Sequence, residues 1–192
     1  MDFQELVTSR RTVQNYVSRA EVDVAAVREA LELSLWAPNH KLTFPWVYVW
    51  IGDRARAALA ELAVELKQAK SGEVFSPAKA GAARENVLAP SVLIGLGVKL
   101  LPGGGGIDEH RYHEDFATLA CSVQIASLRL WEKGLGSKWS TGGWTVHERT
   151  YELLGVNPGQ VRLEGALMIG QALHTPRVPP RPSLDQFLRS TE

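Results

Sequence analysis

The distribution of apolar residues predicts helices and strands along most of the chain. Helices are predicted in five places, which are residues 3–8, 21–36, 53–70, 108–133 and 147–154. Apolar runs rich in β-branched residues predict buried strands at residues 46–51, 91–98 and 163–169. Residues 116–130 are apolar on nearly every side, which a helix tolerates only when protein surrounds it. A subunit interface would supply that second cover.

Breakers and capping residues divide these elements. Ser18 and Glu21 have the Ser-x-x-Glu spacing of a capping box, which predicts that the second helix starts there. Residues 71–86 mix small, charged and proline residues without periodicity and are predicted to be irregular. Residues 137–143 form a polar segment before two glycines and are predicted to be a ligand-contacting loop. From Gln171 onward, prolines predict an extended tail.

Composition restricts the classes of protein that this chain can be. With 192 residues, 45% of them hydrophobic and 22% charged, the chain is expected to form a single domain over residues 1–192, with the proline-rich tail at 171–192. Lysine plus arginine equals aspartate plus glutamate at 21 each, so no net basic field exists to hold nucleic acid or an anionic membrane. No apolar run reaches the roughly 18 residues of a membrane span.

Cysteine usage and the first residues point to a cellular compartment. Cys121 is the one cysteine, so neither a disulfide framework nor a thiolate metal cluster is available. Met1 is followed by acidic Asp2 and Glu5 rather than by a basic and then apolar leader. These features together predict a cytoplasmic location.

A rigid polar corner joins the second helix to the first strand. Pro38 and Pro45 fix their own φ near −65° and push the preceding residues out of helical geometry, so the residues between them have little freedom. His40 lies in this corner, and its ring nitrogens can donate to or accept from a heteroaromatic ligand. A capping or surface role is the more common alternative for a lone histidine.

A second polar turn follows the first helix. Arg10 and Arg11 supply two planar donor forks, and Thr12 adds a hydroxyl. Guanidinium groups bind phosphate through paired hydrogen bonds, so this turn is a candidate phosphate site. Adjacent arginines at the end of a helix are more often solvated, or bonded to the last helical carbonyls.

Three other kinds of site fit the sequence less well. His110, His113, Glu114 and Asp115 invite a metal interpretation, but a charged first helical turn explains them better, and no metal site is predicted. The glycines at 103–106 lack the Lys-Ser/Thr ending of a nucleotide P-loop and are expected to be a flexible connection. No serine lies in a Gly-x-Ser-x-Gly motif, which disfavours a hydrolase.

Among six tryptophans, Trp139 has small polar neighbours and is the candidate for ligand contact rather than core packing.

Taken in order, these motifs resemble the nitroreductase family over most of the chain. The resemblance rests on four stretches, which are Ser9-Arg10-Arg11-Thr12, Ala37-Pro38-Asn39-His40-Lys41, Pro45-Trp46, and Gly134-Leu135-Gly136 leading to Trp139-Ser140-Thr141-Gly142. The short length and the Ala-Pro-x-His-Lys corner are most similar to the small YdjA-like NAD(P)H nitroreductases. Each motif alone is loose, and the specificity comes from their order and spacing.

The resemblance implies an α+β fold with an antiparallel sheet of four or five strands flanked by helices, in an intertwined homodimer with FMN at the subunit interface. By analogy, Arg10, Arg11 and Thr12 bind the phosphate and ribityl end of FMN. Trp139, Ser140 and Thr141 would line the same subunit's side of the flavin. Pro38, His40 and Phe44 would arrive from the partner.

The implied activity passes electrons from NAD(P)H through FMN to nitro, quinone or other electron-poor conjugated compounds. No side chain need act as acid or nucleophile, so no catalytic residue is named. Two departures from the family pattern concern the flavin. Phe44 stands where relatives usually carry an amide, and Val13 and Gln14 stand where many place a basic residue. A flavin-binding or flavin-storing protein without turnover, and a dimeric scaffold without cofactor, are the alternatives.

Overall fold

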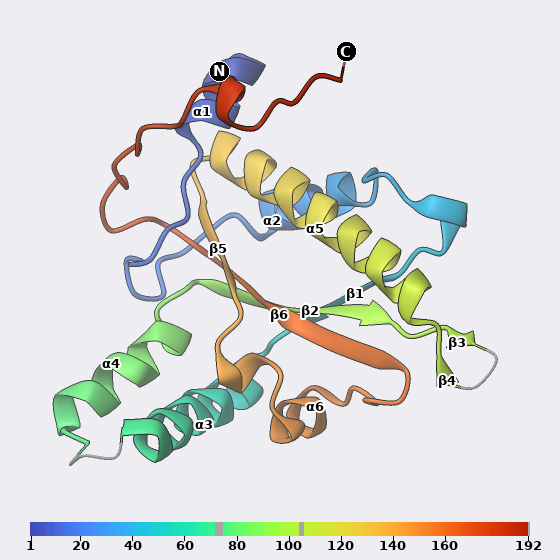
Figure 1. Cartoon of the computed structure of the whole chain (residues 1–192). Helices are drawn as coiled ribbons and strands as arrows, with labels where there is room; N and C mark the ends of the chain where they lie inside the picture. The colour runs from blue at the N-terminus through green and yellow to red at the C-terminus, as the bar shows by residue number, and fades with distance from the viewer. Residues whose placement is uncertain (72–74, 104–105, 192) are drawn as a thin grey trace.

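A four-stranded antiparallel sheet forms the centre of the protein (Figure 1). The structure is a computed structural model that describes residues 1–71, 75–103 and 106–191. The strand order is β1-β2-β6-β5, and the strands are β1 (Trp46–Trp50), β2 (Val92–Lys99), β6 (Val161–Gly170) and β5 (Gly136–Ser140). The fold class and the strand number expected from the sequence are thereby confirmed. Two further short strands, β3 (Pro102–Gly103) and β4 (Gly106–Ile107), pair with each other.

Helices cover both faces of this sheet. Figure 1 shows α2 (Val24–Ser34) and α5 (Glu109–Glu132) on one face. The other face carries α3 (Asp53–Ser71), α4 (Pro77–Leu88) and α6 (Glu148–Leu154). Both central strands are therefore buried on two sides, which explains why β2 and the second half of β6 are apolar without alternation.

The long helix α5 is the main support of the first face. Asp108 caps its N-terminus by accepting a hydrogen bond from the backbone N–H of Arg111 at 3.0 Å. One stripe of α5 packs into the core, whereas Ala117, Cys121 and Gln124 are exposed. The prediction that protein surrounds residues 116–130 thus holds for only part of the helix within one chain.

The expectation of an irregular segment at residues 71–86 was wrong, because α4 occupies most of it. Residues 72–74 lie outside the described part of the chain. Ser76 caps α4 through its hydroxyl, which accepts from the N–H of Lys79 at 3.3 Å, and Pro77 occupies the first helical turn, where its missing N–H costs nothing. Small residues let α4 pack closely on α3, with Ala83 and Val87 buried between them. Alanine-rich helices of this kind show little amphipathic pattern.

The predicted start of the second helix was also wrong. The helix begins at Val24, and Asp23 caps it by accepting hydrogen bonds from the N–H groups of Ala25 and Ala26. Ser18 instead lies in a turn that ends at Arg19, whose φ of 51° is incompatible with a right-handed helix. Ser18 and Asp23 are both residue types that cap helices, and the helix begins after Asp23, which is nearer to the apolar stripe.

The segment predicted to be a loop after Gly136 is the edge strand β5. It pairs with β6 from Gly136 opposite Gly170 to Ser140 opposite Ala166. A polar composition concealed it, because Ser137 and Ser140 are buried in the sheet without any apolar alternation. Sheet pairing across a distance of about 30 residues is not visible in a local pattern.

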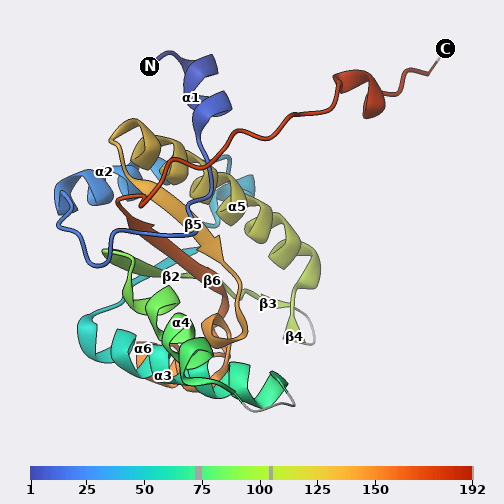
Figure 2. The same ribbon diagram turned by 90° about the vertical axis from the view of Figure 1, so that its left-hand side faces the viewer.

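Both ends of the chain project from the body (Figure 2). Helix α1 (Phe3–Ser9) contributes no buried residue, and the tail after Gln171 is largely extended, as expected, apart from the short 3-10 turn η3 (Leu184–Gln186). The tail leaves Val178 and Phe187 exposed, and α1 leaves Phe3 77% exposed. In the described part of the chain, no helix is both long and apolar enough to cross a membrane.

Candidate functional site

The arginine turn, residues 10–12, lies at the C-terminus of α1. The guanidinium of Arg11 donates hydrogen bonds to the carbonyl oxygens of Thr8 and Arg10. Arg11 is therefore bonded to carbonyl groups at the end of the helix, which is the common role of an arginine at this position. Its Nε is buried and has no hydrogen-bond partner among the described residues. The Nε of Arg10 is also buried, and it too has no hydrogen-bond partner among the described residues. Burial and the charges of Arg11 and Arg181 lower the pKa of Arg10.

The turn continues directly onto the edge of the sheet. Thr12 forms a parallel bridge with Ser137 of β5, and the N–H of Val13 donates to the carbonyl of Ser137 at 3.0 Å. The approach is close enough that a Cβ on Gly136 would lie 2.3 Å from a methyl carbon of Val13. The structure thus places residues 10–12 beside the start of β5, the strand that also carries Trp139 and Ser140.

Within the second segment the three side chains differ. The indole N–H of Trp139 donates to the carbonyl of Glu164 at 3.0 Å, and its ring lies 6.1 Å from that of Phe116. Trp139 is therefore partly buried and packs against the core on the α5 side of the sheet, and its expected contact with a ligand stays a prediction. Ser140 is 5% exposed, and Thr141 is exposed.

The outer edge of β5 remains available beyond Ser137. Alternate residues of an edge strand direct their N–H and C=O groups away from the neighbouring strand. The carbonyl of Ser137 does so toward Val13, and the same alternation applies to Trp139, whereas Thr141 follows the end of the strand. The backbone of this segment, more than its side chains, can offer hydrogen bonds to a ligand.

A cavity of about 620 Å³ adjoins these two segments. Its walls come from the chain that follows the arginine turn, from α3, α4 and β5, and from the start of the tail. The polar residues that line it are Gln14, Asn15, Tyr16, Lys67, Glu85, Asn86 and Lys138. A second cavity of about 290 Å³ shares Lys67 and Asn86 with the first and reaches Ser140 and Gly142. The volumes are typical of cavities that accept cofactor-sized ligands.

This cavity is the part of the site that the sequence does not reveal. The apolar stripe of α3 indicates only a structural helix, α4 has no clear periodicity, and Lys138 lies in a stretch whose composition is typical of a loop. Lys67 carries its charge on the polar side of α3, and Lys138 and Trp139 point to opposite faces of a strand. That alternation becomes visible only once residues 137–140 are known to be a strand.

The proline-bounded corner has a strained backbone. Lys41, Leu42 and Phe44 have φ values of 56°, 52° and 46°, in the left-handed region that residues with a Cβ avoid. Each such residue costs on the order of 1–3 kcal/mol, so the surrounding structure must hold the corner in place. Clusters of such residues are typical of functional sites.

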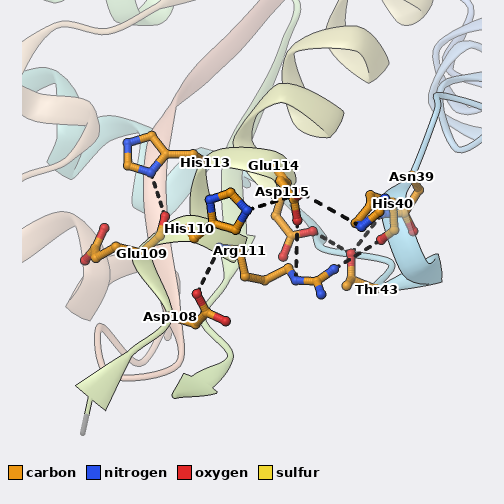
Figure 3. Close-up of polar contacts among 10 residues, drawn as sticks. All are labelled: Asn39, His40, Thr43, Asp108, Glu109, His110, Arg111, His113, Glu114 and Asp115. Carbon is orange, nitrogen blue, oxygen red and sulfur yellow. Dashed lines mark hydrogen bonds and ion pairs between the residues drawn. The ribbon is translucent and has the colours of Figure 1, made fainter. Parts of the chain in front are cut away.

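Hydrogen bonds account for this restraint (Figure 3). The side chain of Asn39 accepts from the N–H of Phe44 at 2.8 Å and donates to the hydroxyl of Thr43 at 2.8 Å. Thr43 in turn donates to Asp115 of α5 at 2.5 Å. Asp115 is only 1% exposed, and its second oxygen is buried without a partner among the described residues.

Two predicted site residues of the corner, Phe44 and His40, are exposed. Phe44 is 54% exposed and its ring lies 6.2 Å from that of Trp46. The Nε2 of His40 lies 3.9 Å from an oxygen of Glu114, and the same oxygen lies 3.7 Å from Nε2 of His110 (Figure 3). Pro38 is also exposed.

The histidines near the start of α5 have partners other than a metal. His113 Nδ1 lies 2.6 Å from the carbonyl of Glu109, and Arg111 lies 3.7 Å from the second oxygen of Glu114. Among residues 1–71, 75–103 and 106–191, no group of three or more histidine, cysteine, aspartate or glutamate side chains is arranged to hold a metal ion.

The corner and the arginine turn lie at opposite ends of α5. Asp115 anchors the corner, whereas Trp131 donates to the hydroxyl of Ser9 at 3.1 Å beside the arginine turn. At about 1.5 Å per residue, these two anchors are roughly 24 Å apart along the helix. In Figure 1, α1 lies beside one end of α5, and the segment between α2 and β1 lies toward the other end. Within one chain, the third predicted segment therefore does not converge with the other two.

Comparisons with known proteins identify the family. The family model described as "Nitroreductase family" matches residues 7–171, so the chain belongs to this family. The match includes the arginine turn, the corner and all strands of the central sheet. The resemblance inferred from the sequence is confirmed.

Individual relatives agree with this assignment. The chain is 24% identical over 190 residues to "Putative NAD(P)H nitroreductase YfhC" of Bacillus subtilis (strain 168), covering 96% of this chain and 92% of that protein. It superposes on the crystal structure of a nitroreductase-like family protein from Bacillus cereus with a TM-score of 0.80 and 25% identity, covering 100% and 97% of the two chains. A "putative nitroreductase in complex with FMN" from Exiguobacterium sibiricum gives a TM-score of 0.77 at 16% identity, covering 100% and 98%.

Proposed function

We propose that this protein is an FMN-dependent oxidoreductase that passes electrons from NAD(P)H to nitro, quinone or other electron-poor conjugated compounds. The observation that carries the proposal is the continuity between the arginine turn, the outer edge of β5 and the adjoining cavity of about 620 Å³. FMN has an anionic end, a polar chain and a planar ring. The two arginines of the turn suit the anionic end, the hydroxyl of Thr12 suits the polar chain, and the edge of β5 with the adjoining cavity suits the ring.

The residues at the phosphate end fit an anion. Arg10 has a buried Nε without a partner among the described residues, and burial together with the charges of Arg11 and Arg181 lowers its pKa. A bound phosphate would relieve this repulsion and accept the free donors. Arg181 belongs to the tail, so its proximity to Arg10 supports a role for the tail at the phosphate.

The remaining predicted contacts follow the path of the chain. Thr12 would bind the ribityl chain, and the outward backbone groups near Trp139 and Thr141 would meet the ring beside Ser140. Bound FMN supplies the two-electron carrier between donor and acceptor. The chain's own residues bind and orient the flavin and set the charge around it. No catalytic residue is assigned.

A homodimer would complete the site, with residues 1–192 of each copy forming one domain whose tail lies on its mate. The corner presents Pro38, His40 and Phe44 outward at the far end of α5 from the arginine turn. Exposed apolar residues elsewhere support a covered face, among them Phe3, Trp36 at 85% exposure, Leu42, Phe187 and the small stripe of Ala117 and Cys121 on α5. In such a dimer, the partner's corner would close over the flavin.

Mixed dimers test this arrangement directly. A dimer that pairs an Arg10→Ala chain with a His40→Ala chain keeps one intact site if each site takes its arginine from one copy and its histidine from the other. Titration of the apoprotein should then find one tight FMN per mixed dimer. Two weakened sites, one without Arg10 and the other without His40, would indicate that both residues act within one chain.

The visible absorption spectrum of the purified protein tests the cofactor. We expect flavin bands and, in stopped-flow mixing with NADPH, their bleaching within seconds. A protein that holds FMN but shows no bleaching over many seconds would support the alternative of a flavin-storing protein, which Phe44 favours because it replaces a polar flavin contact by a ring. A colourless protein that takes up no FMN would support the scaffold alternative.

A further inference from the structure

Lys138 of β5 lines the cavity of about 620 Å³. Its neighbour Trp139 packs toward α5, so the side chain of Lys138 points to the face that carries α3 and α4. Its ammonium donates to the side-chain oxygen of Asn86 on α4 at 3.3 Å. A lysine held in this way on a β-strand is placed more firmly than one on an exposed helix.

Positive charge in this cavity is not neutralised by an ion pair. Lys67 of α3 lines the same cavity, and Glu85 is its one acidic lining residue. None of the ion pairs found among the described residues involves Lys67, Lys138 or Glu85. Burial and the charge of Lys67 lower the pKa of Lys138. Two lysines that repel each other across a cavity favour a ligand that is, or becomes, negative.

The segment that follows the arginine turn brings no charged side chain into this cavity. Gln14 follows the arginine turn and lines this cavity, but it is neutral. Lys138 and Lys67 reach the same space from other elements. The two cationic side chains that line this cavity are therefore on β5 and α3.

We propose that Lys138, positioned by Asn86 and assisted by Lys67, faces the N1 and O2 edge of the flavin ring and raises its midpoint potential. This assignment rests on the proposed function. Reduction of the bound flavin adds two electrons and one proton and leaves one negative charge on that edge. A cation there stabilises the reduced form more than the oxidised form, so the protein controls the potential electrostatically.

The competing explanation is a structural lysine whose only task is to bond Asn86. That role predicts a loss of stability on substitution and no change of potential. The proposed role predicts a lower potential with similar affinity for oxidised FMN. The midpoint potential therefore separates the two, because a structural contact does not distinguish the oxidation states of the flavin.

The test is spectroelectrochemical titration of FMN-loaded wild type, Lys138→Met and Lys138→Arg. We expect Lys138→Met to weaken the binding of reduced FMN about tenfold relative to oxidised FMN, which is about 30 mV for a two-electron couple. Lys138→Arg should keep most of the wild-type potential. Lys79→Met is the matched control, because Lys79 is an exposed lysine on α4 that lines neither cavity.

A Lys138→Met protein that binds FMN with the wild-type midpoint potential would overturn the proposal. If this variant does not fold, Lys138→Gln and Lys67→Met are titrated instead, and unchanged potentials in both would overturn it equally. Failure of the proposed function looks different: the wild-type protein would then take up no FMN at all, or its FMN would not be reduced by NADPH.

Discussion

The two ends of α5 carry polar clusters of opposite character. Near its C-terminal end, the arginine turn has two buried Nε donors, those of Arg10 and Arg11, without a hydrogen-bond partner among the described residues. The neighbouring cavity is lined by Lys67 and Lys138, neither of which forms an ion pair within that part of the chain. At its N-terminal end, Asn39, Thr43 and Asp115 are hydrogen-bonded to one another and hold a strained backbone, and one oxygen of Asp115 is left without a partner among the described residues. The first cluster favours an anionic ligand, because such a ligand would pair with its positive charges. The second cluster presents a rigid surface, because its hydrogen bonds fix the backbone of the corner.

This difference explains why one chain has only part of the proposed site. Charged groups without partners can lower their free energy by binding a ligand. A hydrogen-bonded cluster instead contributes to a binding site through the shape and the exposed side chains that it holds in place. Four substitutions test the contrast between the two ends, and the one expected to cost the most free energy comes first.

Gly165→Ala should destabilise the sheet beneath the ligand-binding end. Gly165 has a φ of 138°, and a Cβ there would lie 2.5 Å from the carbonyl oxygen of Ser140. We expect a loss of about 3 kcal/mol in the free energy of unfolding, from overpacking and backbone strain. Urea denaturation measures it. Gly81→Ala is the control, because no atom outside its own helix backbone lies within 4 Å of where the new methyl group would stand, and alanine favours the interior of α4.

Arg10→Ala should weaken FMN binding by about 10- to 150-fold, because it removes a charge-assisted hydrogen bond of about 1.5–3 kcal/mol. Isothermal titration of the apoprotein with FMN measures it. Lys79→Ala removes a lysine that lines neither cavity and should leave the affinity unchanged. Equal affinities of the two variants would contradict the phosphate assignment.

Thr43→Val should destabilise the corner without changing its shape outside. The valine keeps the volume but removes the hydroxyl that links Asn39 to Asp115, which leaves a buried carboxylate without its donor. We expect a loss of about 2 kcal/mol, measured by urea denaturation at fixed protein concentration. Thr141→Val, at an exposed threonine of the other region, should change stability by less than about 0.5 kcal/mol. Similar losses in both variants would remove the contrast between the two regions.

Phe44→Asn should stabilise the corner slightly. Asparagine tolerates a positive φ better than phenylalanine does, and Phe44 sits at 46°. We expect a gain of about 1 kcal/mol, or roughly 2–4 °C in Tm for a chain of this size. Differential scanning calorimetry measures it. A lower Tm would mean that the contact between the rings of Phe44 and Trp46 outweighs the strain.

Elements with a local pattern could be predicted from the amino-acid sequence. The apolar runs of β2 and β6, the approximate extent of α5, and the prolines that frame the corner were readable because periodicity and fixed φ act over a few residues. The order of the arginine turn, the corner and the segment at 139–141 was enough to indicate the family.

The remaining features depend on how these elements pack together in three dimensions. Strand β5 exists because β6 lies beside it, and α4 is stable because α3 covers its small residues. The cavity that joins Gln14, Lys67 and Lys138 depends on contacts between residues far apart in the chain. Burial, pairing and the meeting of like charges are properties of such contacts, so no local pattern contains them.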